Sequence, residues 1–286
     1  MKRTLSTIGL WTIVLGTVAL FGVGGGVLLL AVFTTLAQYE LQVLLEKSGL
    51  PPWKYATLAL GFAMVLQAGI NLPCGVFLGL IGVIALVLGA LACAQNPTGL
   101  HRLAGSVLAL AYVPGMMLCY AIILRRFGMD CRQGNGEGLV IWVIAVAKFT
   151  DVGGYLVGSA IGRHKLAPSI SPGKTWEGVM GGLMLAMVVS LGIYRFLPNW
   201  LPWWFLQIHA LWLPIPIGIA AIISDLSESA IKRRAGVKDS GNCIPGIGGA
   251  LDLADSLLLS APVAFYLLSI FQGDYRGPWV APWPFF

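Results

Sequence analysis

Acidic residues near the C-terminus have the spacing of a metal site. Asp225 and Glu228 are three residues apart, and so are Asp252 and Asp255. Residues three apart lie on the same face of a helix, so each pair would project from one side of its helix. Two facing pairs of carboxylates offer the hard oxygen ligands that suit Mg²⁺ bound together with substrate phosphates.

Basic residues and glycines separate the two acidic pairs. Lys232, Arg233, Arg234 and Lys238 are followed by a Pro-Gly-x-Gly-Gly turn at 245–249. Glycines let the backbone approach a phosphate, and successive backbone amides can form an anion-binding nest. Carboxylates beside lysines and a glycine turn are the groups that metal-assisted phosphoryl transfer requires.

Structural roles are the alternative for single residues of this segment. Asp252 could cap a helix, and Glu228 and Lys232 could form a surface pair four residues apart. However, nine charged residues lie between 225 and 255, in a chain with only 10% charged residues. This concentration favours a polar site over a purely structural explanation.

A second polar segment covers residues 148–177. Lys148 and Asp151 are three apart inside an apolar stretch, where ionisable groups are costly and face a polar cavity or each other. Lys174 lies in a basic loop before the next apolar run, and such a loop at a helix N-terminus can bind an anion. The phosphate-loop motif does not fit, because position 168 is proline where it needs glycine and no strand is expected before it. The alternatives are a mutually neutralising Lys148–Asp151 pair and a loop that is basic only to set topology.

The composition indicates which elements must position these residues. Of 286 residues, 57% are apolar and 10% are charged, whereas soluble domains carry about 25% charged residues. We therefore predict an all-α, polytopic integral membrane protein, with N-terminal spans in 1–130 and a C-terminal catalytic region in 131–286. A spanning helix needs about 20 mostly apolar residues. Nine segments are candidates, at approximately 5–22, 27–46, 55–71, 74–94, 103–124, 138–158, 176–197, 210–230 and 255–272.

The distribution of lysine and arginine predicts the orientation. With the N-terminus in the cytoplasm, twelve of these residues fall on the cytoplasmic side and five on the other, in agreement with the positive-inside rule. The charge-free loop at 198–209 carries Trp200, Trp203 and Trp204, as expected at the outer interface. Both polar segments would then lie at the cytoplasmic face.

Two motifs resemble those of a known enzyme family. Residues 229–252 read Ser-x-x-Lys-Arg-x-x-x-x-Lys-Asp-x-Gly-x-x-x-Pro-Gly-x-Gly-Gly-x-x-Asp, which closely resembles the signature of phosphatidate cytidylyltransferases, also called CDP-diacylglycerol synthases. Asp151-x-Gly-x-Tyr155 and the segment 171–178 are similar to that family's second block. The chain departs from the family at Ile247 and Leu253, where histidine and arginine are common.

The resemblance implies a reaction and its partners. The protein would transfer a cytidylyl group from CTP to phosphatidate with Mg²⁺, giving CDP-diacylglycerol and pyrophosphate for phospholipid synthesis. Its partners would be CTP, phosphatidate and the membrane, with no role for nucleic acid. We expect it in the bacterial inner membrane. It stays open whether a monovalent cation joins the Mg²⁺ and whether the protein forms a homodimer.

Residue roles follow by matching positions in the motifs. We expect Asp225, Asp252 and Asp255 to bind Mg²⁺, with Asp239 and Asp151 as supporting carboxylates. A phosphate monoester is already largely dianionic near neutral pH, so the reaction needs no strong general base and Ile247 is compatible with it. The predicted catalytic residues are Asp225, Lys238, Asp239 and Asp252, and the predicted substrate-binding residues are Asp151, Lys174, Ser229, Lys232, Arg233, Gly246, Gly248 and Gly249.

Three other functions compete with this interpretation. One is a CTP-dependent kinase or cytidylyltransferase that acts on another lipid, such as a polyprenol, phytol or an archaeol-type lipid. The second is a transporter in which Lys148 and Asp151 form an ion path. The third is an inactive relative with a structural role. The transporter hypothesis leaves the 229–252 signature unexplained.

Overall fold

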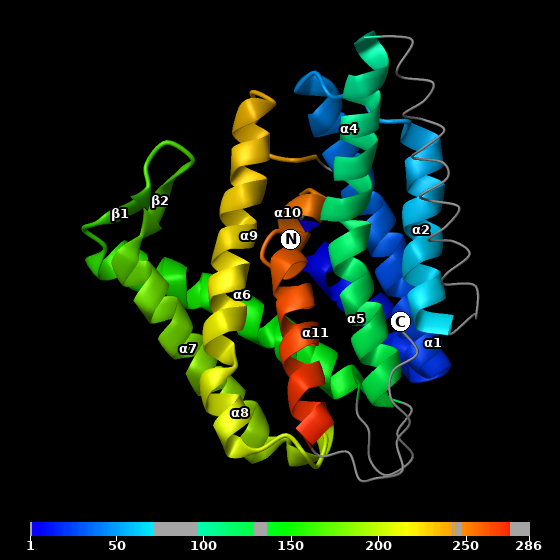
Figure 1. The fold of residues 1–286 in the computed structure, drawn as a ribbon. Coiled ribbons are helices and arrows are strands. Elements are labelled where there is room, and N and C mark those ends of the chain that lie inside the picture. The colour runs from blue at the N-terminus through cyan, green and yellow to red at the C-terminus, as the bar shows by residue number, and fades with distance from the viewer. Residues whose placement is uncertain (1, 71–96, 129–135, 242, 244–247, 275–286) are drawn as a thin grey trace.

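The computed structural model describes residues 2–70, 97–128, 136–241, 243 and 248–274, which form a helical bundle with one β-hairpin (Figure 1). The first half of the bundle contains α1 (Lys2–Lys47), α2 (Lys54–Ile70), α4 (Pro97–Tyr112), α5 (Pro114–Gly128) and α6 (Gly136–Ile161). The hairpin of β1 (Lys165–Ala167) and β2 (Ser171–Thr175) follows. The remaining elements are α7 (Trp176–Phe196), η1 (Pro198–Trp200), α8 (Gln207–Trp212), α9 (Pro214–Arg234), α10 (Ala250–Ala254) and α11 (Leu257–Asp274).

Six helices in the described residues are long and apolar enough to cross a membrane: Phe21–Lys47, Gly99–Phe127, Gly136–Ile161, Trp176–Phe196, Gln207–Arg234 and Ala250–Gln272. They correspond to six of the nine predicted spans, and the all-α membrane architecture is confirmed at that level. The predicted span 55–71 is the 17-residue helix α2, and the predicted span 74–94 lies outside the described residues. The count of nine is therefore not confirmed.

The first two predicted spans lie in α1, which consists of two helical segments joined at a kink. The helix α1 continues from Lys2 to Lys47, with a single break at Gly22, where φ is 53° and ψ is −141°. A side chain would make this conformation costly, so the break falls at a glycine. The connection between these two predicted spans is thus a kink at one glycine.

The connection between α6 and α7 is not the irregular loop that an all-α prediction implies. β1 pairs antiparallel with β2, with Lys165 opposite Thr175 and Ala167 opposite Ser171. The Trp176 amide donates to His164 O at 2.9 Å, which closes the base of the hairpin. Thr175 then starts α7, because its Oγ1 accepts a hydrogen bond from the Gly178 amide at 3.1 Å. A strand therefore precedes the Lys174 segment, contrary to the sequence-based expectation.

Glycines bring α6 and α7 into close contact. A Cβ on Gly178 would lie 2.7 Å from Gly154 O, and one on Gly153 would lie 2.8 Å from Gly181 O. Substituting either glycine would push the two backbones apart. Close approach through small residues is typical of helix pairs in membranes.

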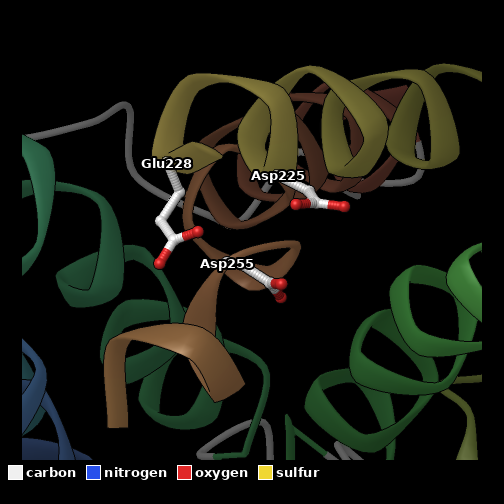
Figure 2. Close-up of side chains that lie close together, drawn as sticks. All are labelled: Asp225, Glu228 and Asp255. Atoms are coloured by element: carbon white, nitrogen blue, oxygen red, sulfur yellow. The ribbon is translucent and has the colours of Figure 1, made fainter. Parts of the chain in front are cut away.

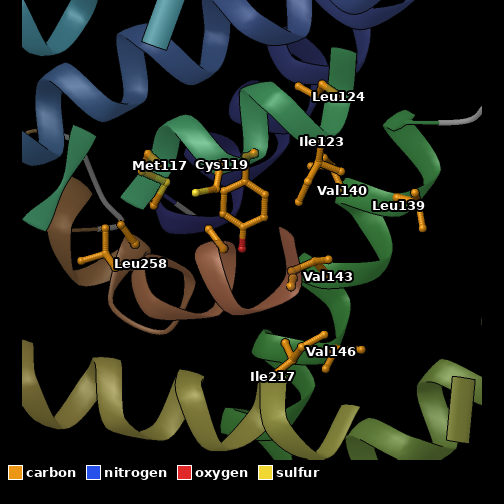
Figure 3. Close-up of a cluster of buried hydrophobic side chains, with 14 of the residues drawn as sticks. Met117, Cys119, Ile123, Leu124, Leu139, Val140, Val143, Val146, Ile217 and Leu258 are labelled. Carbon is orange, nitrogen blue, oxygen red and sulfur yellow. The ribbon is translucent and has the colours of Figure 1, made fainter. Parts of the chain in front are cut away.

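The core lies where α5, α6, α9 and α11 meet (Figure 3). Its largest fully buried side chain is that of Trp142, whose Nε1 donates to Ser190 Oγ at 2.9 Å. Ser190 Oγ in turn donates to Ala210 O at 2.7 Å, so α6, α7 and α8 are joined by one chain of hydrogen bonds. The core holds the helices so that the hairpin, the C-terminal end of α9 and the N-terminal end of α2 lie at one end of the bundle (Figure 1).

Candidate active site

Three carboxylates from the last helices form one cluster. Oxygens of Asp225, Glu228 and Asp255 lie within 4.8 Å of one another (Figure 2). Asp225 and Glu228 project from α9, whereas Asp255 lies at the break between α10 and α11. The structure thus brings together residues from both acidic pairs that the sequence singled out. It adds Glu228, which is fully buried, to the ligands that were expected.

Lysines from separate elements pair with these carboxylates. Lys174 Nζ lies 2.7 Å from Asp225 Oδ2, and Lys148 Nζ lies 3.2 Å from Asp255 Oδ1. Lys148 therefore reaches across to the break between α10 and α11, and its ion pair within the described residues is with Asp255 and not with Asp151 on its own helix. Charges pair in this way because isolated ions are costly inside a bilayer.

Asp252 lies beside the cluster and is linked to it through Lys232. Lys232 Nζ is 2.5 Å from Glu228 Oε2 and 2.9 Å from Asp252 Oδ1. Both carboxylate oxygens of Asp252 also accept the Ser240 amide at 3.2 Å. Asp252 is thus held by Lys232 and by the glycine-rich loop, which is the segment 235–249 between α9 and α10. The third carboxylate of the cluster, beside Asp225 and Asp255, is therefore Glu228 and not Asp252.

The network carries one more carboxylate than ammonium groups. Its members are Asp225, Glu228, Asp252 and Asp255 on one side and Lys148, Lys174 and Lys232 on the other. Glu228 is 0% exposed, and its Oε1 has no hydrogen-bond partner among the described residues. An unpartnered buried carboxylate oxygen is costly unless a cation binds it. The donor set therefore fits a hard divalent cation such as Mg²⁺.

The β-hairpin positions Lys174. Besides pairing with Asp225, Lys174 Nζ donates to Ile222 O on α9 at 3.2 Å. Arg233 Nε donates to Ile170 O at the hairpin turn, at 3.5 Å. The hairpin is thus attached to α9 at two places, and a predicted substrate-binding arginine has a structural contact.

The break between α10 and α11 positions Asp255. The Ser256 amide donates to Asp255 Oδ1 at 2.6 Å. Ser224 Oγ on α9 donates to Asp255 O and accepts from the Leu259 amide at 3.2 Å. These contacts satisfy Asp255 O and the amides of Ser256 and Leu259 at the break, and the Asp255 carboxylate lies with the acidic side chains of α9.

The other predicted site residues are spread around this centre. Ser229 Oγ donates to Asp225 Oδ1 at 3.4 Å, and Asp151 is half-buried on α6, one turn from Lys148. Lys238 and Asp239 are exposed, and neither side chain makes an ion pair or hydrogen bond within the described residues. Gly248 has φ of 130° and Gly249 precedes α10, while Gly246 lies outside the described residues.

Two contacts to this region were not anticipated from the sequence. Lys148 was singled out only with Asp151, although its partner lies 107 residues further on. Glu40 on α1 received no role, although it accepts hydrogen bonds from Ser240 and Leu251. The only signal for it was a carboxylate inside the apolar segment 27–46, where ionisable residues are rarely without a function.

Comparison with known proteins agrees with the motifs. The chain matches the Cytidylyltransferase family over residues 1–271. It is 32% identical over 250 residues to the phosphatidate cytidylyltransferase of Staphylococcus haemolyticus, covering 85% of this chain and 91% of that protein. It is 37% identical over 165 residues to the phosphatidate cytidylyltransferase of Bacillus subtilis, and this match spans 58% of each protein. It is also 36% identical over 222 residues to the uncharacterized protein YnbB of Escherichia coli, covering 76% of this chain and 70% of that protein. Because the family match extends over nearly the whole chain, the protein belongs to the cytidylyltransferase family.

Proposed function

We propose that this protein transfers the cytidylyl group of CTP to phosphatidate, forming CDP-diacylglycerol and releasing pyrophosphate. The observation that carries the proposal is the cluster of Asp225, Glu228 and Asp255, surrounded by lysines, in a member of the cytidylyltransferase family. Relatives named phosphatidate cytidylyltransferase support phosphatidate as the acceptor.

The carboxylate cluster is the proposed place for Mg²⁺. Asp225 and Asp255 would bind it, with Glu228 as a further ligand and Asp252 positioned by Lys232 at its side. A bound Mg²⁺ would neutralise triphosphate charge and polarise the phosphorus that is attacked. Removing divalent cations with EDTA should abolish turnover, and adding Mg²⁺ should restore it.

The residues of the chain orient the two substrates and balance their charge. A phosphatidate oxygen attacks the α-phosphorus of CTP, and the bond from that phosphorus to the β-phosphate oxygen breaks as pyrophosphate leaves. The attacking phosphate monoester is largely dianionic near neutral pH and needs no strong base. The protein therefore contributes positioning and electrostatic stabilisation.

The cationic residues would stabilise different phosphates of the substrates, according to where each residue lies. Lys174 and Lys232 lie against the carboxylates, where they can stabilise charge at the reacting phosphates. Arg233 and Lys238 are exposed at the edge of the site, where they can bind the outer phosphates of CTP. Asp239, exposed next to Lys238, would serve as a supporting carboxylate.

We place the site at the cytoplasmic face of a bacterial inner membrane, with the N-terminus in the cytoplasm. The excess of lysine and arginine on that side supports this orientation. CTP is then available from the cytoplasm, and the lipid chains remain in the bilayer while the headgroup enters between helices. Reporter fusions at the 198–209 loop and after residue 274 test the topology.

The deciding experiment supplies purified protein with phosphatidate, CTP and Mg²⁺ and measures both pyrophosphate and the liponucleotide. Equal amounts of the two products are expected. Release of CDP with phosphorylation of a lipid alcohol would identify a kinase instead. If CTP were consumed only with another phosphorylated lipid, the protein would be a cytidylyltransferase whose acceptor is not phosphatidate.

A further inference from the structure

A carboxylate from the first described helix lies outside the acidic cluster and contacts the glycine-rich loop. Glu40 lies on α1, seven residues before the end of that helix, and is 2% exposed. The residues that it contacts follow it by 200 to 211 positions in the chain. The proposed mechanism gives this buried acid no part.

Three hydrogen bonds converge on Glu40, two from the glycine-rich loop and one from α10. Oε2 accepts Ser240 Oγ and the Leu251 amide, each at 2.9 Å, and Oε1 accepts the Cys243 amide at 3.2 Å. Glu40 forms no ion pair within the described part of the chain. Its charge is therefore stabilised by loop donors, and charge-assisted hydrogen bonds of this kind are the stronger ones.

Two glycines of the sequence motif make room for this carboxylate. A Cβ on Gly241 would lie 2.5 Å from Glu40 Oε1. A Cβ on Gly249 would lie 2.7 Å from Glu40 Oε2 and 2.8 Å from Asp252 Oδ2. Of the glycines that a phosphate was expected to approach, Gly249 is thus already packed against a side chain of α1.

The contacts of Glu40 lead directly to the proposed site. Ser240, which donates its hydroxyl to Glu40, donates its amide to both oxygens of Asp252. Leu251, which donates its amide to Glu40, is the residue before Asp252. Asp252 then pairs with Lys232, which also pairs with Glu228.

We propose that Glu40 is a positioning residue: it holds Ser240 and the start of α10 so that Asp252 and Lys232 are aligned with the carboxylate cluster. The inference rests on the proposed function for its effect on catalysis. It assigns part of the glycine-rich motif to contact with α1 and not to phosphate binding.

The kinetic test compares Glu40→Gln with Glu40→Ala and uses Glu46→Gln as the matched control. Glu46 is on the same helix but exposed, and its only ion pair is with Lys54 at 3.7 Å, within the described residues. Gln keeps one accepting oxygen and places an amide NH₂ against loop donors, so kcat should fall about 10-fold, and further for Ala. The KM for phosphatidate should change by less than about twofold, because a positioning residue acts through the alignment of Asp252 and does not itself contact the substrate.

Each outcome of the kinetic test decides the question. A kcat for Glu40→Gln equal to that of the Glu46→Gln control would overturn the proposal. A lower KM for CTP with unchanged kcat would also overturn it, since Glu40 would then compete with a phosphate for the loop amides. Ser240→Ala is a second variant, and its effect should be less than additive with that of Glu40→Gln if both act through Asp252.

A measurement without substrates separates this inference from the proposed function. Amide hydrogen exchange over 240–251 and maleimide labelling of Cys243 should both be faster in Glu40→Gln than in the wild type, with exchange in α6 and α7 unchanged. If wild-type protein fails to make CDP-diacylglycerol, the proposed function fails, but faster loop exchange would still support the contact. Unchanged exchange and labelling would end the proposal whatever the activity.

Discussion

The α6–α7 pair and the α9–α11 region hold their helices together by opposite means. Helices α6 and α7 meet through glycines that bring backbone against backbone, as Gly154 and Gly178 do. Helices α9, α10 and α11 meet through carboxylates, lysines and a helix break at Asp255. The first arrangement depends on shape and the second on charge. Substitutions in the first should therefore affect stability, and substitutions in the second should affect activity.

The largest effect is expected at the charged region. Asp225→Asn removes one carboxylate from the cluster and leaves Lys174 without its partner at 2.7 Å. Turnover of CTP should fall by about 100-fold or more, because charge stabilisation at the reacting centre is lost. Steady-state kinetics at saturating Mg²⁺ measures this. Ser227→Ala, on the same helix with an exposed hydroxyl, is the control and should retain activity. Near-normal turnover by Asp225→Asn would remove this residue from the proposed metal site.

Substitutions at the glycine contact between α6 and α7 should lower stability and leave activity nearly unchanged. Gly182→Ala would drive a Cβ into Thr150 O, and we expect a loss of about 1–3 kcal/mol of stability. Activity per folded molecule should change little, because no group of the cluster moves directly. Thermal unfolding in detergent checks the stability. Gly192→Ala, where the added Cβ meets no atom within 4 Å, is the matched control on the same helix and should be neutral. Equal stability of the two variants would contradict the packing argument.

The hairpin joins the two regions, and its lysine should show a smaller effect. Lys174→Ala removes the ammonium beside Asp225, and kcat/KM for CTP should fall about 10-fold. Lys165→Ala, on the opposite strand and exposed, carries the same charge change without that contact. Initial rates over a range of CTP concentrations compare the two variants. If both lost activity equally, Lys174 would act only through the overall charge of the hairpin.

The smallest effect is expected at the glycine-rich loop's thiol. Desolvation and the hydrogen-bonded Glu40 carboxylate raise the pKa of Cys243 to about 11. The thiol is therefore protonated from pH 7 to 9, and a protonated thiol is a poor nucleophile. Cys243→Ser should keep kcat within about twofold of the wild type. The rate of maleimide labelling of Cys243 should keep rising up to about pH 11. A rate that levels off near pH 9 would show that the pKa of this thiol is not raised.

The sequence predicted the elements better than their contacts. The apolar segments located six spanning helices, because helix length in a bilayer is set by its thickness. The three-residue spacing correctly placed Asp225 and Glu228 on one face of α9 and drew attention to Asp255. Both inferences concern residues close together in the chain, and the periodicity of a helix is enough to make them.

Contacts between distant segments could not be read in the same way. Whether Glu228 or Asp252 joins the cluster depends on the break between α10 and α11, which redirects Asp255 toward α9. The β-hairpin has too few residues for a periodic pattern to reveal it. The partner of Glu40 lies 200 residues away, and nothing in local spacing indicates such a pair.

The contact between Glu40 and Ser240 also concerns biosynthesis. The ribosome makes Glu40 long before it makes the residues that donate hydrogen bonds to it, so α1 must enter the bilayer with a carboxyl group whose donors do not yet exist. Until the last helices insert, water or the insertion machinery has to solvate that group. The contacts of Glu40 with Ser240, Cys243 and Leu251 can therefore form only after the C-terminal part of the chain has been made.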